Sequence, residues 1–174
     1  EVISSYDLSS MKWILHGAAP CPVEVKRAII EWFGPIVFEY YAATEGGGCF
    51  IDSEEWLLKP GSVGKANEGV EVKILDEEDQ QVKEGMEGTI YFKAPETGRF
   101  EYYKAKEKTS GAYRGDYFTM GDIGYRDSDG YYFLTGRSAD TIISGGTNIY
   151  PQEIDDVLLA HQSVAEVCCI GVPN

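Results

Sequence analysis

The chain has few soft metal ligands: two histidines and four scattered cysteines among 174 residues. The cysteines show no CxxC spacing, so neither a zinc site nor a disulfide framework is supported. We therefore expect a reduced, cytoplasmic setting. The cysteines are Cys21, Cys49, Cys168 and Cys169.

Positive charge is also scarce. The chain has 15 Lys and Arg residues and 29 Asp and Glu residues, which gives a formal net charge of -14. This balance argues against general attraction to nucleic acid or to anionic membrane surfaces. Any polyanionic ligand must therefore be held by local groups.

Long hydrophobic runs are missing as well. No apolar run approaches the roughly 18–20 residues that cross a bilayer, and residues 1–15 contain no targeting signal. The chain also lacks an initiator Met and stops just after an apolar run, at CCIGVPN. We therefore expect a fragment with no transmembrane segment.

The residue patterns in the first part of the chain predict an α/β region. Residues 12–17 (KWILHG) favour a buried strand, and residues 22–33 favour a helix with Pro22 in its first turn and Gly34 after its end. Residues 36–41 (IVFEYY) predict a second strand, so the unit is typical of a parallel sheet. We expect the glycines at 46–48 to end this strand.

The later patterns predict a small, distorted antiparallel β-barrel or sheet, and then the start of an α+β unit. Residues 70–75 and 89–94 alternate apolar and polar side chains, and the DSDG turn at 127–130 predicts a hairpin. The final pattern predicts a strand at TIIS, a Gly-Gly loop, a helix at 151–161 and a strand at 164–172.

Two catalytic motifs are excluded. PGSVGKA (60–66) is GxxGK followed by Ala rather than a GxxxxGK[ST] phosphate loop. No GxSxG motif is present, and neither histidine lies in a sequence that suggests a triad. Serine hydrolase chemistry is therefore unsupported.

The stretch YYAATEGGG (40–48) is the first candidate site, because ligands of open α/β sheets lie at the carboxyl ends of strands. A tyrosine ring can stack on a purine, a threonine hydroxyl can donate to phosphate, and a glutamate can hold Mg²⁺. Taken alone, the stretch is better explained by Tyr40 or Tyr41 in the core, Glu45 at a solvated strand end and a glycine loop.

Asp122 in FTMGD and Arg137 in the GR dipeptide form a second candidate cluster. An acid and a guanidinium that converge can hold vicinal hydroxyls such as those of ribose. Each residue alone is more often a turn residue or a surface cation.

The order of these motifs is more informative than any one of them. The motifs occur in the order HGAAPCP, YxxTE, PGSVG, GD, and GR followed by SGGTNIYPQEID. With this order the sequence resembles the AMP-forming adenylating superfamily over nearly the whole chain. This superfamily includes acyl- and aryl-CoA synthetases, adenylation domains of peptide synthetases, and luciferases. SGGTNIYPQEID (144–155) is most similar to the fatty-acyl and aryl-CoA synthetases.

The resemblance implies an ATP-dependent, AMP-forming acid–CoA ligase whose partners are a carboxylic acid, ATP with Mg²⁺, and CoA. Thr44 and Glu45 are then the catalytic candidates, Thr44 on the α-phosphate and Glu45 as the Mg²⁺ ligand. Gly145 and Gly146 are implied to approach the pantetheine arm of CoA, and Ala139 is implied to be a hinge. The implied nucleotide-binding residues are Gly17, Ala18, Ala19, Pro20, Tyr41, Thr44, Asp122 and Arg137.

The resemblance also implies a division of the chain. We expect the end of an N-terminal α/β subdomain at 1–58, a small barrel at 59–136, a hinge at 137–140 and the start of a C-terminal lid at 141–174. The family's phosphate loop and C-terminal lysine have no counterpart in this sequence, so we expect the chain alone to be inactive. A non-catalytic nucleotide- or acyl-binding module and a domain that loads a carrier protein stay open as alternatives.

Three positions depart from the family pattern. Ala18 replaces the second glycine of the family's GGAPL segment, and Ala42 replaces the glycine that usually follows the tyrosine. Ala139 lies where the family often has Asp or Lys. Neither of the first two changes removes a functional group, whereas alanine at 139 implies that a polar hinge contact is missing.

Overall fold

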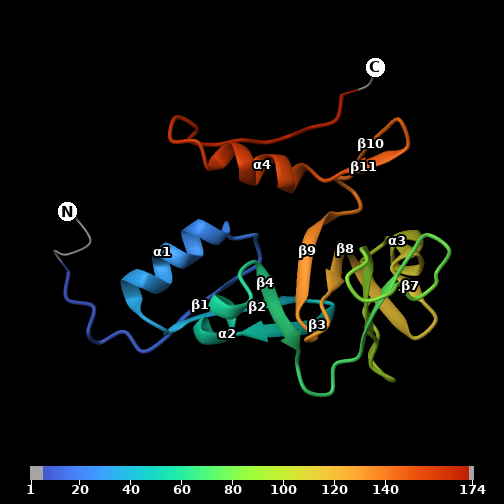
Figure 1. Cartoon of the computed structure of the whole chain (residues 1–174). Helices are drawn as coiled ribbons and strands as arrows, with labels where there is room; N and C mark the ends of the chain where they lie inside the picture. Colours follow the sequence, from blue (N-terminus) through green and yellow to red (C-terminus); the bar gives the residue numbers. More distant parts are fainter. Residues whose placement is uncertain (1–5, 173–174) are drawn as a thin grey trace.

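The computed structural model describes residues 6–172. Its main feature is one nine-stranded sheet with the order β1-β2-β3-β4-β9-β8-β6-β5, in which β7 pairs separately with β8 (Figure 1). The bounds of these strands are β1 Ile14–Gly17, β2 Val37–Ala43, β3 Gly46–Ile51, β4 Ser62–Ala66, β5 Val72–Leu75, β6 Gly88–Lys93, β7 Tyr113–Arg114, β8 Tyr117–Arg126 and β9 Tyr132–Arg137.

The first three elements form the predicted parallel unit. β1 pairs with β2 in parallel, and helix α1 (Val23–Phe33) connects them. Pro22 lies at the N-cap of α1, and Gly34 follows its last turn with a left-handed φ of 81°. Both signals therefore act where the sequence indicates.

The predicted second strand, β2, ends at Ala43, before the glycines at 46–48 that we expected to end it. They open β3, which returns antiparallel to β2. Gly47 has a φ of 79°, and a Cβ there would lie 2.8 Å from Cγ of Phe92. Glycine is needed because the hairpin presses its backbone onto an aromatic ring.

A short helix and one strand then connect the two halves of the sheet. Helix α2 (Ser53–Leu58) was not predicted; the Asp52 side chain caps it by accepting from the backbone N–H of Glu55 at 2.8 Å. The motif that resembles a phosphate loop forms β4. β4 pairs with β3 on one side and with β9 on the other. The sheet therefore continues past residue 58, where we expected the first subdomain to end.

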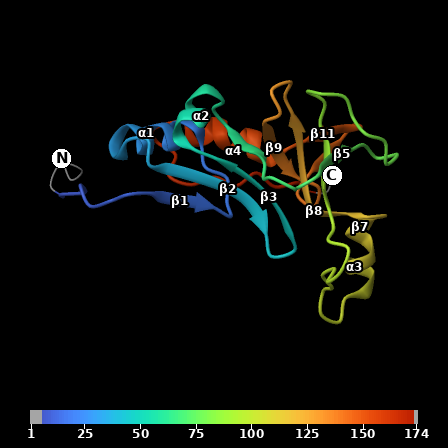
Figure 2. The ribbon, with the colours of Figure 1, turned by 90° about the horizontal axis from the view of Figure 1, so that it is seen from below.

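The predicted hairpins are present, but the barrel is not confirmed. β5 pairs with β6, and the DSDG turn joins β8 to β9. Among the described residues the strands form an open sheet with β1 and β5 at its two ends. Helix α3 (Lys106–Gly111) and β7 project to one side of it in the view of Figure 2.

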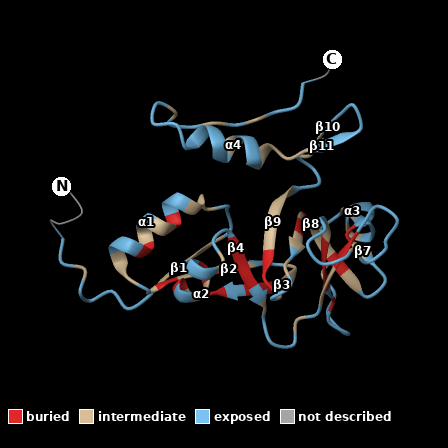
Figure 3. Ribbon diagram, in the orientation of Figure 1, coloured by how far each residue is buried: buried red, intermediate tan, exposed pale blue. Residues whose placement is uncertain are grey.

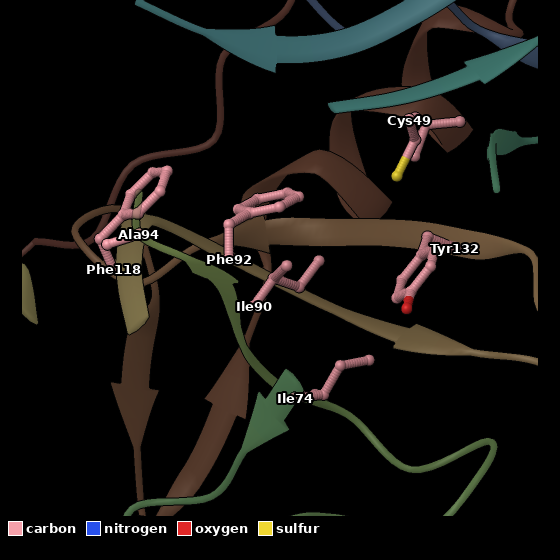
Figure 4. Packing of buried hydrophobic residues seen from close by; sticks show 8 residues of the cluster. Cys49, Ile74, Ile90, Phe92, Ala94, Phe118 and Tyr132 are labelled. Carbon is pink, nitrogen blue, oxygen red and sulfur yellow. The ribbon is translucent and has the colours of Figure 1, made fainter. Parts of the chain in front are cut away.

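Two hydrophobic clusters stabilise this sheet. The larger one centres on Phe92 and Phe118, which are 0% and 1% exposed, and Figure 4 shows them packed with Ile90 and Ala94. The smaller one packs α1 and α2 on the strands through Ile30, Val37, Ile51, Trp56 and Tyr131. The parallel unit and the antiparallel strands therefore have separate cores.

The C-terminal part contains a hairpin, β10 (Ile142–Ser144) with β11 (Thr147–Ile149), and helix α4 (Pro151–Leu159). The predicted strand at 164–172 is wrong, since the structure assigns no strand there. Among the described residues no strand pairs with this segment, and the Cys169 N–H donates to Oδ1 of Asp155 at 2.8 Å instead. Figure 3 shows α4 and this segment mostly exposed. No helix of the described chain is long and apolar enough to cross a membrane.

Candidate functional site

A cleft of about 910 Å³ is lined by residues of the sheet and by residues of α4 and the segment after it. The loop after β1, the carboxyl end of β2, the end of β9, α4 and residues 168–171 all contribute to its lining. Its volume falls within the roughly 300–1,000 Å³ of small-molecule sites. The cleft is therefore large enough for a nucleotide.

Three predicted site residues converge at one wall of this cleft. The Tyr41 hydroxyl donates to Oδ2 of Asp122 at 2.6 Å, and Nε of Arg137 donates to Oδ1 at 3.0 Å. Asp122 is 5% exposed, whereas the Arg137 side chain is 63% exposed. β2, β8 and β9 thus bring together residues that are up to 96 positions apart in the sequence.

The Asp122 carboxylate still has capacity for a ligand. An ionised carboxylate offers about four lone-pair sites, and the two contacts from Tyr41 and Arg137 use one on each oxygen. Burial, followed by the neighbouring Asp122 charge, raises the pKa of Tyr41 above its ordinary value. The phenol therefore stays a donor at neutral pH, and the remaining acceptor sites suit a pair of hydroxyls.

Residues 17–20 form another part of the cleft lining. A Cβ at Gly17 would lie 2.5 Å from the backbone oxygen of Tyr40, so this position requires glycine. Ala18 has a φ of 68°, in the left-handed region. An alanine there costs about 1–2 kcal/mol, which explains why the related motif has a glycine at this place.

Thr44 and Glu45 lie outside the cleft, in the turn between β2 and β3. They are not among its lining residues in the described chain, although the preceding Ala43 is. Glu45 accepts a hydrogen bond from the hydroxyl of Tyr102 at 2.9 Å. Sequence reasoning missed Tyr102, and its position in a loop 57 residues away gave no signal for it.

The remaining candidates lie near the C-terminal part. Ala139 lines the cleft. Gly145 and Gly146 form the exposed turn between β10 and β11, with φ values of 59° and 82°. A Cβ at either glycine would meet no described atom within 4 Å, so the turn conformation accounts for both.

A buried ionic group beneath the cleft was also missed. Lys26 on α1 contacts Glu39 on β2, and Nε2 of His16 lies 3.7 Å from the same carboxylate. Lys26 is 1% exposed, with its ammonium 4.8 Å from the ring centre of Trp56. The isolated glutamate in the apolar strand IVFEYY was the one available signal, because a buried charge needs a partner.

The carboxylates of the described chain can be compared with the ligands that a magnesium ion requires. The described residues contain no group of three His, Cys, Asp or Glu side chains that could hold a metal. Mg²⁺ is commonly bound by one or two carboxylates together with substrate phosphates and water. Glu45 alone therefore fits a magnesium ion that arrives with a nucleotide.

Comparison with known proteins identifies a family and related structures. The family of AMP-binding enzymes matches residues 2–103. The long-chain-fatty-acid–CoA ligase of Bacillus subtilis is 34% identical over 174 residues, which cover 99% of this chain and 31% of the relative. The chain thus spans about a third of the length of such relatives.

Two solved structures share the fold. O-succinylbenzoate coenzyme A synthetase from Bacillus subtilis, in complex with ATP and magnesium ion, matches with a TM-score of 0.86 and 30% identity, over 99% of this chain and 37% of that one. Amide bond synthetase McbA from Marinactinospora thermotolerans matches with a TM-score of 0.86 and 27% identity, over 99% of this chain and 36% of that one.

Proposed function

Because the chain belongs to the family of AMP-binding enzymes, we propose that it forms part of an acid–CoA ligase that activates a fatty or aryl acid with ATP. The observation that carries this proposal is the buried Asp122 carboxylate, which is held by Tyr41 and Arg137 and keeps acceptor sites free beside the cleft. The relatives named as fatty-acid–CoA ligase and O-succinylbenzoate–CoA synthetase support the two acid classes.

The charges around the cleft indicate how a nucleotide lies. Among the described lining residues, five are carboxylates, Glu39, Asp122, Asp140, Asp155 and Asp156, and one is a cation, Arg137. Lys26 compensates Glu39 and Arg137 compensates Asp122, so the three aspartates at 140, 155 and 156 leave the cleft negative. Such a wall repels a polyphosphate but accepts a neutral adenosine. The adenosine then occupies the cleft with its ribose hydroxyls on Asp122, and the phosphates extend to the Thr44–Glu45 turn.

The proposed reaction has two steps. A carboxylate oxygen of the acid bonds to the α-phosphorus of ATP, and the bond from that phosphorus to the pyrophosphate oxygen breaks. The CoA sulfur then bonds to the acyl carbon, AMP leaves with its oxygen, and the thiol proton passes to solvent. The first step turns a poor electrophile into one with a good leaving group.

Each residue has a limited part in this scheme. The Thr44 hydroxyl would donate to an α-phosphate oxygen, and Glu45 would hold the magnesium ion, which would supply positive charge against the charge that develops on the departing pyrophosphate. The Tyr41 ring borders the adenine, and the loop at Gly17–Pro20 separates adenine from the acyl group. Gly145 and Gly146 stay candidates for the approach of CoA, and the cytoplasmic setting stays a prediction.

A binding experiment tests the ribose assignment. We expect the chain to bind AMP about 10- to 100-fold more tightly than 2′,3′-dideoxy-AMP in isothermal titration calorimetry, because hydrogen bonds to a charged group contribute about 1.5–3 kcal/mol. Asp122→Ala should abolish this preference. Asp116→Ala is the matched control, since Asp116 is an exposed carboxylate paired with Arg99.

The proposal fails if the unaltered chain binds both nucleotides equally, or if Asp122→Ala keeps the preference. Pyrophosphate release by an active protein that contains this chain separates a ligase from a non-catalytic binding module. Transfer of the acyl group to CoA rather than to a carrier protein separates the two enzyme alternatives.

A further inference from the structure

Glu45 is held by one side chain from a distant part of the sequence. The Tyr102 hydroxyl donates to Oε1 of Glu45 at 2.9 Å. Tyr102 lies in the loop between β6 and α3, whereas Glu45 lies in the turn between β2 and β3. Tertiary structure alone creates this contact.

The Tyr102 ring is fixed by its surroundings. Its backbone N–H donates to the Thr109 hydroxyl at 2.9 Å, and that hydroxyl donates to the Ala105 carbonyl at 3.0 Å. The ring meets Phe100 edge-on at 5.3 Å, and Lys108 Nζ lies 4.4 Å from its centre. The hydroxyl is therefore presented from a rigid support rather than from a free loop.

The same core supports both partners. Phe100 packs edge-on against the buried Phe118 at 5.3 Å. A Cβ at Gly46, the residue after Glu45, would lie 3.3 Å from Cζ of Phe118. The Glu45 turn and the Tyr102 loop thus rest on one aromatic side chain, which limits their relative movement.

One oxygen of Glu45 is left for a ligand. Oε1 accepts from Tyr102, and within residues 6–172 no other side chain or backbone group donates to Oε2. A glutamate in a turn otherwise samples several rotamers. Anchoring one oxygen selects one orientation of the carboxylate and leaves the other oxygen for a single bond to a cation.

We propose that Tyr102 is a positioning residue, which orients Glu45 so that Oε2 faces a magnesium ion that arrives with the nucleotide. This inference rests on the proposed role of Glu45 in binding that ion. Tyr102 itself does not touch the metal or the reacting atoms. The role resembles that of other outer hydrogen-bond partners, which orient metal ligands in proteins.

Direct metal binding tests the inference without turnover. Mn²⁺ replaces Mg²⁺ as the probe, and water proton relaxation separates Mn²⁺ on the chain–ATP complex from Mn²⁺ on free ATP. We expect Tyr102→Phe to weaken Mn²⁺ binding to the complex about three- to tenfold, which corresponds to one hydrogen bond. ATP binding without metal should not change.

Two controls make the result specific. Tyr103→Phe changes a neighbouring tyrosine that is 86% exposed, and it should leave Mn²⁺ binding unaltered. In a Glu45→Gln background, Tyr102→Phe should have no further effect, because the amide is a poor ligand for a hard cation. Equal thermal unfolding of the unaltered and Tyr102→Phe chains confirms that the ring packing is kept.

The outcomes distinguish failure of the Tyr102 role from failure of the Glu45 role. If Glu45→Gln weakens Mn²⁺ binding but Tyr102→Phe does not, the inference is overturned and the Glu45 assignment stands. If the two substitutions weaken binding additively, Tyr102 acts by another route and the inference is also overturned. If Glu45→Gln has no effect, the proposed role of Glu45 fails and the inference fails with it.

Discussion

At the scale of single residues, the buried charges under the cleft affect stability most directly. Burial lowers the pKa of Lys26 and of His16 from their ordinary values. For His16 the Glu39 charge opposes this shift and the Lys26 charge adds to it. Burial thus favours the neutral form of His16 in the folded chain, and among the described residues its buried Nε2 has no hydrogen-bond partner.

This environment predicts a loss of stability in mild acid. Below the ordinary histidine pKa of about 6.5, the unfolded chain binds a proton at His16 that the folded chain does not bind, because the folded pKa is lower. The free energy of unfolding should therefore fall as the pH drops below about 6.5, by at most about 1.4 kcal/mol per pH unit from this group.

Urea unfolding at pH 7.5 and pH 5.5 measures the effect. His16→Gln should show a smaller loss between the two pH values than the unaltered chain, because the group that titrates is gone. His161→Gln is the matched control, since His161 is exposed. An unchanged pH dependence in His16→Gln would contradict the prediction.

At the scale of elements, glycines allow the strands of the sheet to approach one another closely. Gly64 on β4 has a φ of 94°, and a Cβ there would lie 2.0 Å from the backbone oxygen of Phe50 on β3. Gly69 has a φ of 79°, yet a Cβ there would meet no atom of residues 6–172 within 4 Å. Substitution of Gly69 therefore tests only the loss of stability from the backbone conformation. Substitution of Gly64 adds the loss of stability from close contact.

Gly64→Ala should therefore lower the free energy of unfolding by about 2–5 kcal/mol. About 1–2 kcal/mol comes from the left-handed backbone and about 1–3 kcal/mol from overpacking. Gly69→Ala should cost only the first part. Chemical denaturation of both variants measures the difference, and equal costs would show that β3 and β4 can separate without penalty.

Local pattern predicted most elements, but not the way they join. Alternation found β5, β6 and the β8–β9 hairpin, since a strand with one buried face shows period two. Residues 164–172 also carry an apolar pattern typical of a strand, yet no strand forms there. A strand exists only with a hydrogen-bonded partner, which a pattern within one segment cannot supply.

At the scale of the whole molecule, the α4 segment and the sheet face each other across the cleft, and Ala139 lies in the connection between them. After β9 ends at Arg137, the Ser138 N–H donates to the Gly121 carbonyl at 2.8 Å, and the Asp140 N–H donates to the Arg137 carbonyl at 3.0 Å. In the described chain no backbone hydrogen bond begins at the Ala139 N–H. Proline at 139 would therefore remove no such bond.

We propose that Ala139 is a hinge between a pose for adenylation and a pose for thioester formation. Ala139→Pro fixes φ near -65° and restricts Ser138, so it should trap one pose. In an active protein that contains this chain, acyl-adenylate formation should stay nearly unchanged. Thioester formation from supplied adenylate should fall by about tenfold or more, which corresponds to roughly 1.4 kcal/mol in the activation barrier of that half-reaction.

The two half-reactions can be timed separately, by pyrophosphate release without CoA and by acyl transfer from preformed adenylate. Ala139→Ser serves as the control, because serine leaves φ free. Equal losses in both half-reactions, or no loss in either, would place the hinge elsewhere.

The sequence by itself determined the parallel unit, the β5–β6 and β8–β9 hairpins and the family, because each depends on short stretches whose spacing is readable along the chain. Only the tertiary structure decided which of the marked residues share a site. It brings Tyr41, Asp122 and Arg137 to one cleft wall and places Glu45 in a separate turn against Tyr102. It also buries Lys26 against Glu39. Contacts between distant residues depend on how strands pair and stack across the whole sheet, and this pairing is a property of many segments together.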